Sequence, residues 1–117
     1  MIRTAFVLAA AIGALAASSA AAQDGSKVFA MQCKLCHAAA SGPMGPTLVG
    51  VAGAKIAART DYEYSPALAA KGGTWTDANL DAYLTAPGKF ASGTRMAVAV
   101  TKPADRAAVI SYLKTVR

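Results

Sequence analysis

The chain has 117 residues, and its 12 Lys and Arg residues outnumber its 6 Asp and Glu residues, which gives a net charge of +6. This length predicts a single small domain. The basic residues are scattered singly, without a basic run or interleaved aromatic residues, so the pattern excludes a typical nucleic-acid-binding surface. We interpret the positive charge as a surface that steers an acidic partner toward the protein.

The first 22 residues have the pattern of a cleaved secretory signal peptide. Arg3 precedes an apolar run over residues 5–17, and small residues follow as far as Ala22. The apolar run is shorter than the roughly 20 residues of a membrane-spanning helix, so a retained anchor is the weaker interpretation. We expect cleavage after Ala22, which leaves one domain over residues 23–117 with no integral membrane segment.

A first helix is predicted from about Asp24 to Cys36, and it runs directly into the sequence Cys33-Lys34-Leu35-Cys36-His37. Cys-x-x-Cys-His is the attachment sequence of a covalent c-type haem. Two thiols on one turn can each add to a vinyl group of the same porphyrin. His37 then lies under the iron and can supply an axial imidazole. The motif therefore predicts one haem c, held through Cys33 and Cys36.

A Cys-x-x-Cys pair also occurs in disulfides, zinc sites and thioredoxin-like redox motifs. A zinc site needs about four ligands, but the chain has no second pair of cysteines and no other histidine. A thioredoxin motif needs alternating strands and helices around it, and no such pattern is present. A lone histidine is usually structural, but its place directly after Cys36 reverses that expectation.

The rest of the chain predicts an all-α fold without a sheet. Residues 38–53 are rich in Gly and Pro and predict an ordered loop. A short helix is expected at about 62–68, before Lys71-Gly72-Gly73. A longer helix begins at Thr76, which can cap it, and ends before Pro87.

A closing helix begins near Pro103 and carries an apolar face, which consists of Val109, Tyr112, Leu113 and Val116. We therefore expect three main helices, short helical turns and Gly/Pro-rich loops wrapped around the haem.

The iron needs a second axial ligand, and the sequence contains no second histidine to provide it. Three methionines, a lysine or an open site remain. Met31 lies too close to the attachment motif to reach the far face, and Met44 lies in a Gly/Pro loop where a solvent-facing side chain is expected. Met96 follows a loop, residues 90–95, that can cover the opposite face. Met96 is the preferred candidate.

The ordered set of motifs after residue 23 resembles a class I cytochrome c over nearly all of residues 24–117. Gly25 and Phe29 match the first-helix pair that packs against the last helix, and Gly45 to Gly50 resembles the Gly-Pro-x-Leu-x-Gly loop. The remaining matches are Tyr64, Trp75, Tyr83, Pro87, Phe90, Gly93, Thr94, Arg95, Met96, Tyr112 and Leu113.

The resemblance implies specific roles around the haem. The Pro46 carbonyl accepts a hydrogen bond from the His37 ring, Tyr64 and Trp75 hydrogen-bond a buried propionate, and Tyr83 lies near the Met96 sulfur. Without the resemblance, Tyr64, Trp75 and Tyr83 would be interpreted as core aromatic residues.

Two departures from the family pattern stand out. The segment between His37 and Gly45 is shorter than in mitochondrial relatives, which together with the signal peptide indicates a bacterial periplasmic form. Ala54 stands where many relatives carry an arginine near the inner propionate. Arg59 or Lys55 are the residues that could replace its charge.

The resulting prediction is a soluble, monomeric periplasmic electron carrier with His37 and Met96 as iron ligands. It is not an enzyme, since both axial sites are filled. Its expected partners are redox proteins with acidic docking faces, such as a dehydrogenase, an oxidase or a reductase. One alternative is a cytochrome subunit of a periplasmic dehydrogenase or oxidase complex, and another is a gas sensor in which Met96 leaves the iron. The cations expected around the haem edge are Lys34, Lys71, Lys89 and Arg95.

Overall fold

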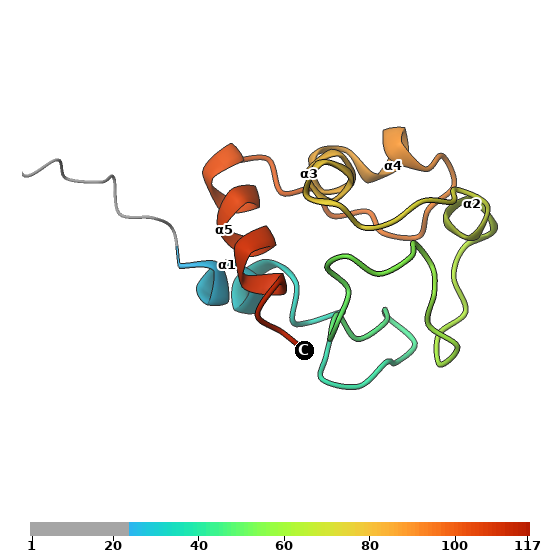
Figure 1. The fold of residues 1–117 in the computed structure, drawn as a ribbon, viewed down its shortest axis with the longest axis horizontal. Helices are drawn as coiled ribbons and strands as arrows, with labels where there is room; N and C mark the ends of the chain where they lie inside the picture. The colour runs from blue at the N-terminus through green and yellow to red at the C-terminus, as the bar shows by residue number, and fades with distance from the viewer. Residues whose placement is uncertain (1–23) are drawn as a thin grey trace, which may run out of the picture.

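The computed structural model describes residues 24–117, so the expected signal peptide lies outside the described residues. Figure 1 shows two helices side by side at one end of the domain, and the other helices together with long loops toward the opposite end. In chain order the helices are α1 (Gly25–Gln32), α2 (Pro66–Ala69), α3 (Asp77–Thr85), α4 (Pro87–Phe90) and α5 (Pro103–Leu113).

Helices α1 and α5 form the base of the fold, and a glycine lets them approach closely. A Cβ atom on Gly25 would lie 2.2 Å from the Ala108 carbonyl oxygen and 2.7 Å from Tyr112 Cβ. One turn along α1, the Phe29 ring packs on Tyr112 with 5.3 Å between ring centroids. The predicted pairing of the first and last helices is therefore present.

Helix α3 begins where the sequence predicts, because the Thr76 hydroxyl accepts a hydrogen bond from the Asn79 amide. It buries Leu80, Tyr83 and Leu84 and packs against both α4 and α5. The helix ends at Thr85, as expected before a proline. The sequence analysis did not anticipate α4, in which Pro87 begins a new turn at a position where its missing amide hydrogen costs nothing.

Three helix boundaries differ from the predictions. Helix α1 stops at Gln32, and residues 33–36 form turns in which the His37 amide donates to the Cys33 carbonyl. Helix α2 begins only at Pro66, because the buried Ser65 hydroxyl caps it by accepting from the Leu68 amide. Val116 lies beyond α5, where its carbonyl accepts from the Gly50 amide at 2.8 Å.

Residues 24–117 contain no named strand, only isolated bridges such as that between Lys55 and Thr74. The expected all-α fold is confirmed. Within the same residues, no helix is both long enough and apolar enough to cross a membrane. The core gathers side chains from the three longer helices and from the loops between them; it includes Val28, Ile56, Leu68, Trp75, Leu80, Leu84, Val100, Val109, Ile110 and Leu113.

Candidate functional site

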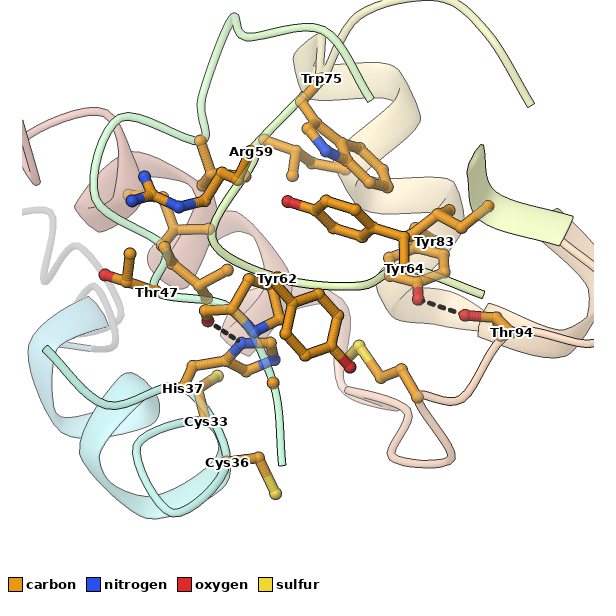
Figure 2. Close-up of a pocket in the computed structure, with 18 of the residues that line it drawn as sticks. Cys33, Cys36, His37, Thr47, Arg59, Tyr62, Tyr64, Trp75, Tyr83 and Thr94 are labelled. Atoms are coloured by element: carbon orange, nitrogen blue, oxygen red, sulfur yellow. Dashed lines mark hydrogen bonds between the residues drawn. The ribbon is translucent and has the colours of Figure 1, made fainter. Parts of the chain in front are cut away.

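A cavity of about 590 Å³ opens between the helices and the loops. Its walls come from the end of α1 and the turn after it, the loop over residues 43–59, residues 62–68, Trp75, helix α3, the segment 94–100 and helix α5. All eight residues that the sequence analysis assigned to the site line this cavity; these are Cys33, Cys36, His37, Pro46, Tyr64, Trp75, Tyr83 and Met96. Figure 2 shows His37 and the two cysteines on one side and Trp75, Tyr83 and Thr94 on the other.

The His37 ring is fixed by a hydrogen bond between its Nδ1 atom and the Pro46 carbonyl oxygen, at 2.8 Å (Figure 2). A carbonyl oxygen can only accept, so Nδ1 carries the proton and Nε2 keeps its lone pair free for a metal. Gly45 allows this close packing, since a Cβ there would lie 2.9 Å from the Cys36 carbonyl and 3.2 Å from the ring.

The two cysteines are not joined in a disulfide. Cys33 is buried, and burial raises the pKa of its thiol to about 11, whereas Cys36 is half-buried. Among residues 24–117, no group of three His, Cys, Asp or Glu side chains could hold a metal ion.

The three methionines of the described chain differ in position. Met31 is 85% exposed and does not line the cavity. Met44 lines it but is 64% exposed, and it lies in the loop that also holds the Pro46 carbonyl. Met96 is half-buried and packs against the core. Met96 is therefore the methionine whose sulfur is best shielded from water at the cavity.

The two residues before Met96 are each tied to another part of the fold. The Tyr83 hydroxyl and Thr94 Oγ1 lie 2.6 Å apart and share a hydrogen bond. Arg95 Nη1 donates to the Glu63 carbonyl oxygen at 2.6 Å. The Tyr83 hydroxyl, which the resemblance placed near the methionine sulfur, is thus engaged two residues before Met96.

The cavity is also lined by aromatic rings and positively charged side chains. The buried Trp75 ring packs against Tyr83 at 5.1 Å and Phe90 at 5.7 Å between centroids. The charged residues among those lining the cavity are Lys55, Arg59 and Arg95, with no Asp or Glu. An apolar cavity of this kind with a cationic rim suits a flat apolar group that carries carboxylates.

The sequence matches the family model for cytochrome c over residues 22–117. A cytochrome c homolog from Rickettsia bellii is 47% identical over 96 residues, which are 79% of this chain and 56% of that protein. Cytochrome c2 iso-1 from Magnetospirillum molischianum is 45% identical over 91 residues, covering 74% of this chain and 91% of the relative. The structure of cytochrome cH from Methylobacterium extorquens superposes with a TM-score of 0.74 at 41% identity, covering 80% of this chain and 97% of that one.

The chain belongs to the cytochrome c family. It is a class I cytochrome c, and proteins of this family are electron carriers rather than enzymes. The chain spans little more than half the length of its relatives from Rickettsia. The matched region covers 55% or 56% of three such relatives, from R. bellii, R. felis and R. conorii.

The cofactor of this cytochrome c is one covalent c-type haem. The cavity fits it: two thiols lie on one turn, an imidazole keeps Nε2 free, a shielded thioether lines the same space, and the rim carries cations. Cys33 and Cys36 would hold the haem through thioether links. His37 and Met96 would supply a nitrogen and a sulfur to the iron.

Sequence reasoning missed one residue that lines this cytochrome c site, Tyr62, and gave no contacts for two that it had named, Thr94 and Arg95. Tyr62 and Thr94 line the cavity, and Tyr62 packs edge-on against Tyr64 at 5.1 Å. Arg95, which was expected as a cation at the haem edge, is exposed, lines the cavity and donates to the Glu63 carbonyl. Three other cations expected around the haem edge do not line the cavity; these are Lys34, Lys71 and Lys89. The Lys71 Nζ atom lies 4.5 Å from the centroid of the Phe90 ring.

Proposed function

We propose that this chain carries single electrons through a c-type haem with His37 and Met96 as axial ligands. The observation that supports this most directly is the pairing of a fixed imidazole with a shielded thioether in one cavity. Met44 is the weaker candidate, because it belongs to the loop that already holds the His37 ring and its side chain is exposed.

When bound, the haem supplies an iron that alternates between the ferrous and ferric states. The protein's part is to hold the ligands and set the potential. The Pro46 carbonyl fixes the His37 tautomer, so Nε2 would keep a free lone pair for the iron. Apolar side chains around the cavity, such as Leu68 and Val100, disfavour additional positive charge. Together with a thioether ligand, this environment raises the reduction potential.

Absorption spectra of matching variants would test the ligand assignment. The ferric protein should show the weak long-wavelength band of a sulfur–iron bond. Met96→Ala should lose this band, and Met44→Ala, the control in the neighbouring loop, should retain it. A band that disappears only in Met44→Ala would assign the ligand to the other methionine. Absence of the band in the unmodified protein would refute methionine ligation.

We infer that the carrier works in the periplasm after removal of residues 1–22. The supporting pattern is the short apolar run between Arg3 and the small residues that end at Ala22. Mass spectrometry of haem protein from a periplasmic extract should give an N-terminus at Gln23. Recovery of the chain with Met1 from the cytoplasm would contradict this.

The same proposal includes partners with acidic docking faces. Cleavage removes only one charged residue, Arg3, so the mature chain keeps a net charge of +5 before the haem carboxylates are counted. Electron-transfer rates with an acidic partner should therefore fall as the Debye length shortens from about 30 Å to about 10 Å between 0.01 and 0.1 M salt. Rates that do not change with salt would exclude electrostatic steering.

A further inference from the structure

Three chain segments meet at one side of the haem cavity: the loop that contains Ser41 and Thr47, the segment 59–64, and the residues just before Met96. Gly42, Pro43, residues 61–63 and Arg95 line one shared hollow there. We call residues 59–64 the clasp, because this segment makes polar contacts to each of the other two.

On the histidine side, the clasp contacts the loop through Asp61. The Ser41 hydroxyl donates to Asp61 Oδ1 at 3.0 Å and accepts from the Thr47 amide at 2.9 Å. Thr47 is buried and directly follows Pro46, whose carbonyl holds the His37 ring. A chain of two hydrogen bonds therefore runs from the clasp to the residue next to the histidine's partner.

Arg59 orients the Asp61 carboxylate for this contact. Its Nε and Nη2 atoms donate to the two carboxylate oxygens at 2.9 and 2.8 Å, in a bidentate pair. The Arg59 hydrogen bonds and the Ser41 hydroxyl lower the pKa of Asp61 below its ordinary value. Bidentate pairs of this kind fix direction as well as distance.

On the methionine side, the clasp contacts the chain through the Glu63 carbonyl. It accepts from Arg95 Nη1 at 2.6 Å, and Arg95 is the residue immediately before Met96. Asp61 and Glu63 are two residues apart, so one short segment touches the supports of both expected iron ligands. Neither contact involves a ligand atom itself.

We propose that the clasp couples the two ligand-bearing loops, and that Asp61 and Arg95 are positioning residues at its two ends. The proposal rests on His37 and Met96 as the iron ligands. It implies that loss of the Asp61 contacts loosens the hold on Met96, although Asp61 makes no hydrogen bond to residues 94–96. Two independent loops would not behave in this way.

The test uses the mature haem protein and the variants Asp61→Ala and Arg95→Gln. Two quantities are measured: the rate of cyanide binding to the ferric protein, which requires departure of the sixth ligand, and amide hydrogen exchange over residues 41–47 and 94–98. Both variants should raise the cyanide rate by about twofold to tenfold, as expected for loss of single polar contacts. Asp61→Ala should speed exchange in both segments.

The matched control is Asp77→Ala, which breaks the exposed Lys114–Asp77 ion pair between α3 and the end of α5. It should leave the cyanide rate and the exchange at 94–98 unchanged. Ser41→Ala breaks the same link as Asp61→Ala from the other side and should reproduce its effect. It also provides the test if Asp61→Ala does not fold.

Two results would overturn the proposal. One is faster exchange over residues 41–47 alone in Asp61→Ala and Ser41→Ala, which would show that the loops are independent. The other is an Arg95→Gln protein with unchanged cyanide rate and exchange. Failure of the ligand assignment gives a different result: the unmodified protein would lack the sulfur–iron band. The hydrogen-exchange data would still decide whether the two loops are coupled.

Discussion

The histidine and methionine sides of the cavity are built in different ways. On the histidine side, the proposed iron ligand itself is held: the His37 amide donates to the Cys33 carbonyl, and the ring donates to the Pro46 carbonyl. Helix α1 ends at Gln32, shortly before His37 in the chain, and Leu113 of α5 lines the same cavity. Sequence proximity to the attachment cysteines adds a further restraint.

On the methionine side, the chain neighbours of Met96 are held instead of the proposed ligand itself. Thr94 bonds to Tyr83, Arg95 bonds to Glu63, and the Val100 amide donates to the Leu84 carbonyl at 2.8 Å. The Met96 side chain has packing contacts only. We therefore expect His37, which makes its own hydrogen bonds, to keep its position when nearby residues are changed. Met96 is held only through its chain neighbours, so we expect its side chain to move first when those neighbours are changed.

The largest predicted effect comes from breaking the helical base under the histidine side. Gly25→Val would place a side chain where even a Cβ overlaps the Ala108 carbonyl. We expect a loss of about 2 to 3 kcal/mol in the free energy of unfolding, measured by urea denaturation of the haem protein. Below the unfolding transition, the sulfur–iron band should remain.

Gly88→Ala is the control, because no atom lies within 4 Å of a Cβ at that position. It should unfold at nearly the same urea concentration as the unmodified protein. If Gly25→Val also unfolds there, the close approach of α1 to α5 does not contribute to stability.

A smaller effect is expected from Gly45→Ala, which acts on the His37 ring itself. Its Cβ would lie 2.9 Å from a backbone oxygen of Cys36, which cannot move as freely as a side chain. We expect a loss of about 1 to 2 kcal/mol in thermal unfolding experiments. The cyanide-binding rate should stay within about twofold, because this variant leaves the clasp contacts of Ser41 and Arg95 in place.

Gly42→Ala in the same loop has open space around its Cβ and should be neutral. A large rise in the cyanide rate for Gly45→Ala would mean that strain at the His37 ring reaches Met96 without loss of a clasp contact.

A similar contrast, between contacts of chain neighbours and contacts of distant segments, explains which features could be predicted from the sequence alone. Local signals were sufficient where a residue acts on its own chain neighbours: Thr76 caps α3, Pro103 begins α5, and Cys33 to His37 forms the attachment turn. The start of α2 was misplaced because the Ser65 cap outweighs the apolar pattern before it. Capping is a local signal, so this error was avoidable.

Contacts between distant segments were not predictable in this way. Arg95 and Glu63 are 32 residues apart, and the bond joins a side chain to a backbone carbonyl that carries no residue-specific signal. The Ser41–Asp61 bond spans 20 residues of loop without regular spacing. Only the folded arrangement of the loops shows that these segments meet.

Tyr83→Phe should loosen the methionine side with a smaller loss in the free energy of unfolding. The variant keeps the ring among Trp75 and Phe90 but removes the 2.6 Å bond to Thr94. We expect about 1 kcal/mol of destabilisation and loss of the sulfur–iron band at a lower temperature, followed by absorbance during heating. Thr94→Val should match it, and a band that persists unchanged in both would remove this bond from the support of Met96.

Tyr83 also predicts a difference in stability between the Tyr83→Phe variant and the unmodified protein at high pH. Burial, as the largest cause, raises the pKa of Tyr83, against a smaller lowering by the Thr94 bond. A raised folded-state pKa stabilises the fold fully below the unfolded value of about 10, and this contribution is lost as pH rises through the folded pKa. Tyr83→Phe should therefore lose less stability than the unmodified protein above pH 10, measured by urea unfolding. Equal losses would show that another group dominates there.

The smallest predicted effect is a gain in stability away from both ligands. Ala57 has a φ of +59°, in the left-handed region that costs a residue with a Cβ about 1 kcal/mol or more. Ala57→Gly removes that strain but adds freedom to the unfolded chain, so we expect a net gain of about 0.5 kcal/mol. Ala58→Gly, next to it but without a positive φ, should instead be destabilising by about the same amount.

This pair of variants distinguishes unfolding of the whole chain from local opening of the methionine side. If the methionine side opens without unfolding of the whole chain, Ala57→Gly should raise the urea midpoint while leaving the cyanide-binding rate unchanged. The reason is that the global free energy changes but the contacts of Thr94 and Arg95 do not. A cyanide rate that falls in proportion to the added stability would show that Met96 leaves the iron only when the whole fold opens, and the two sides of the cavity would then yield together.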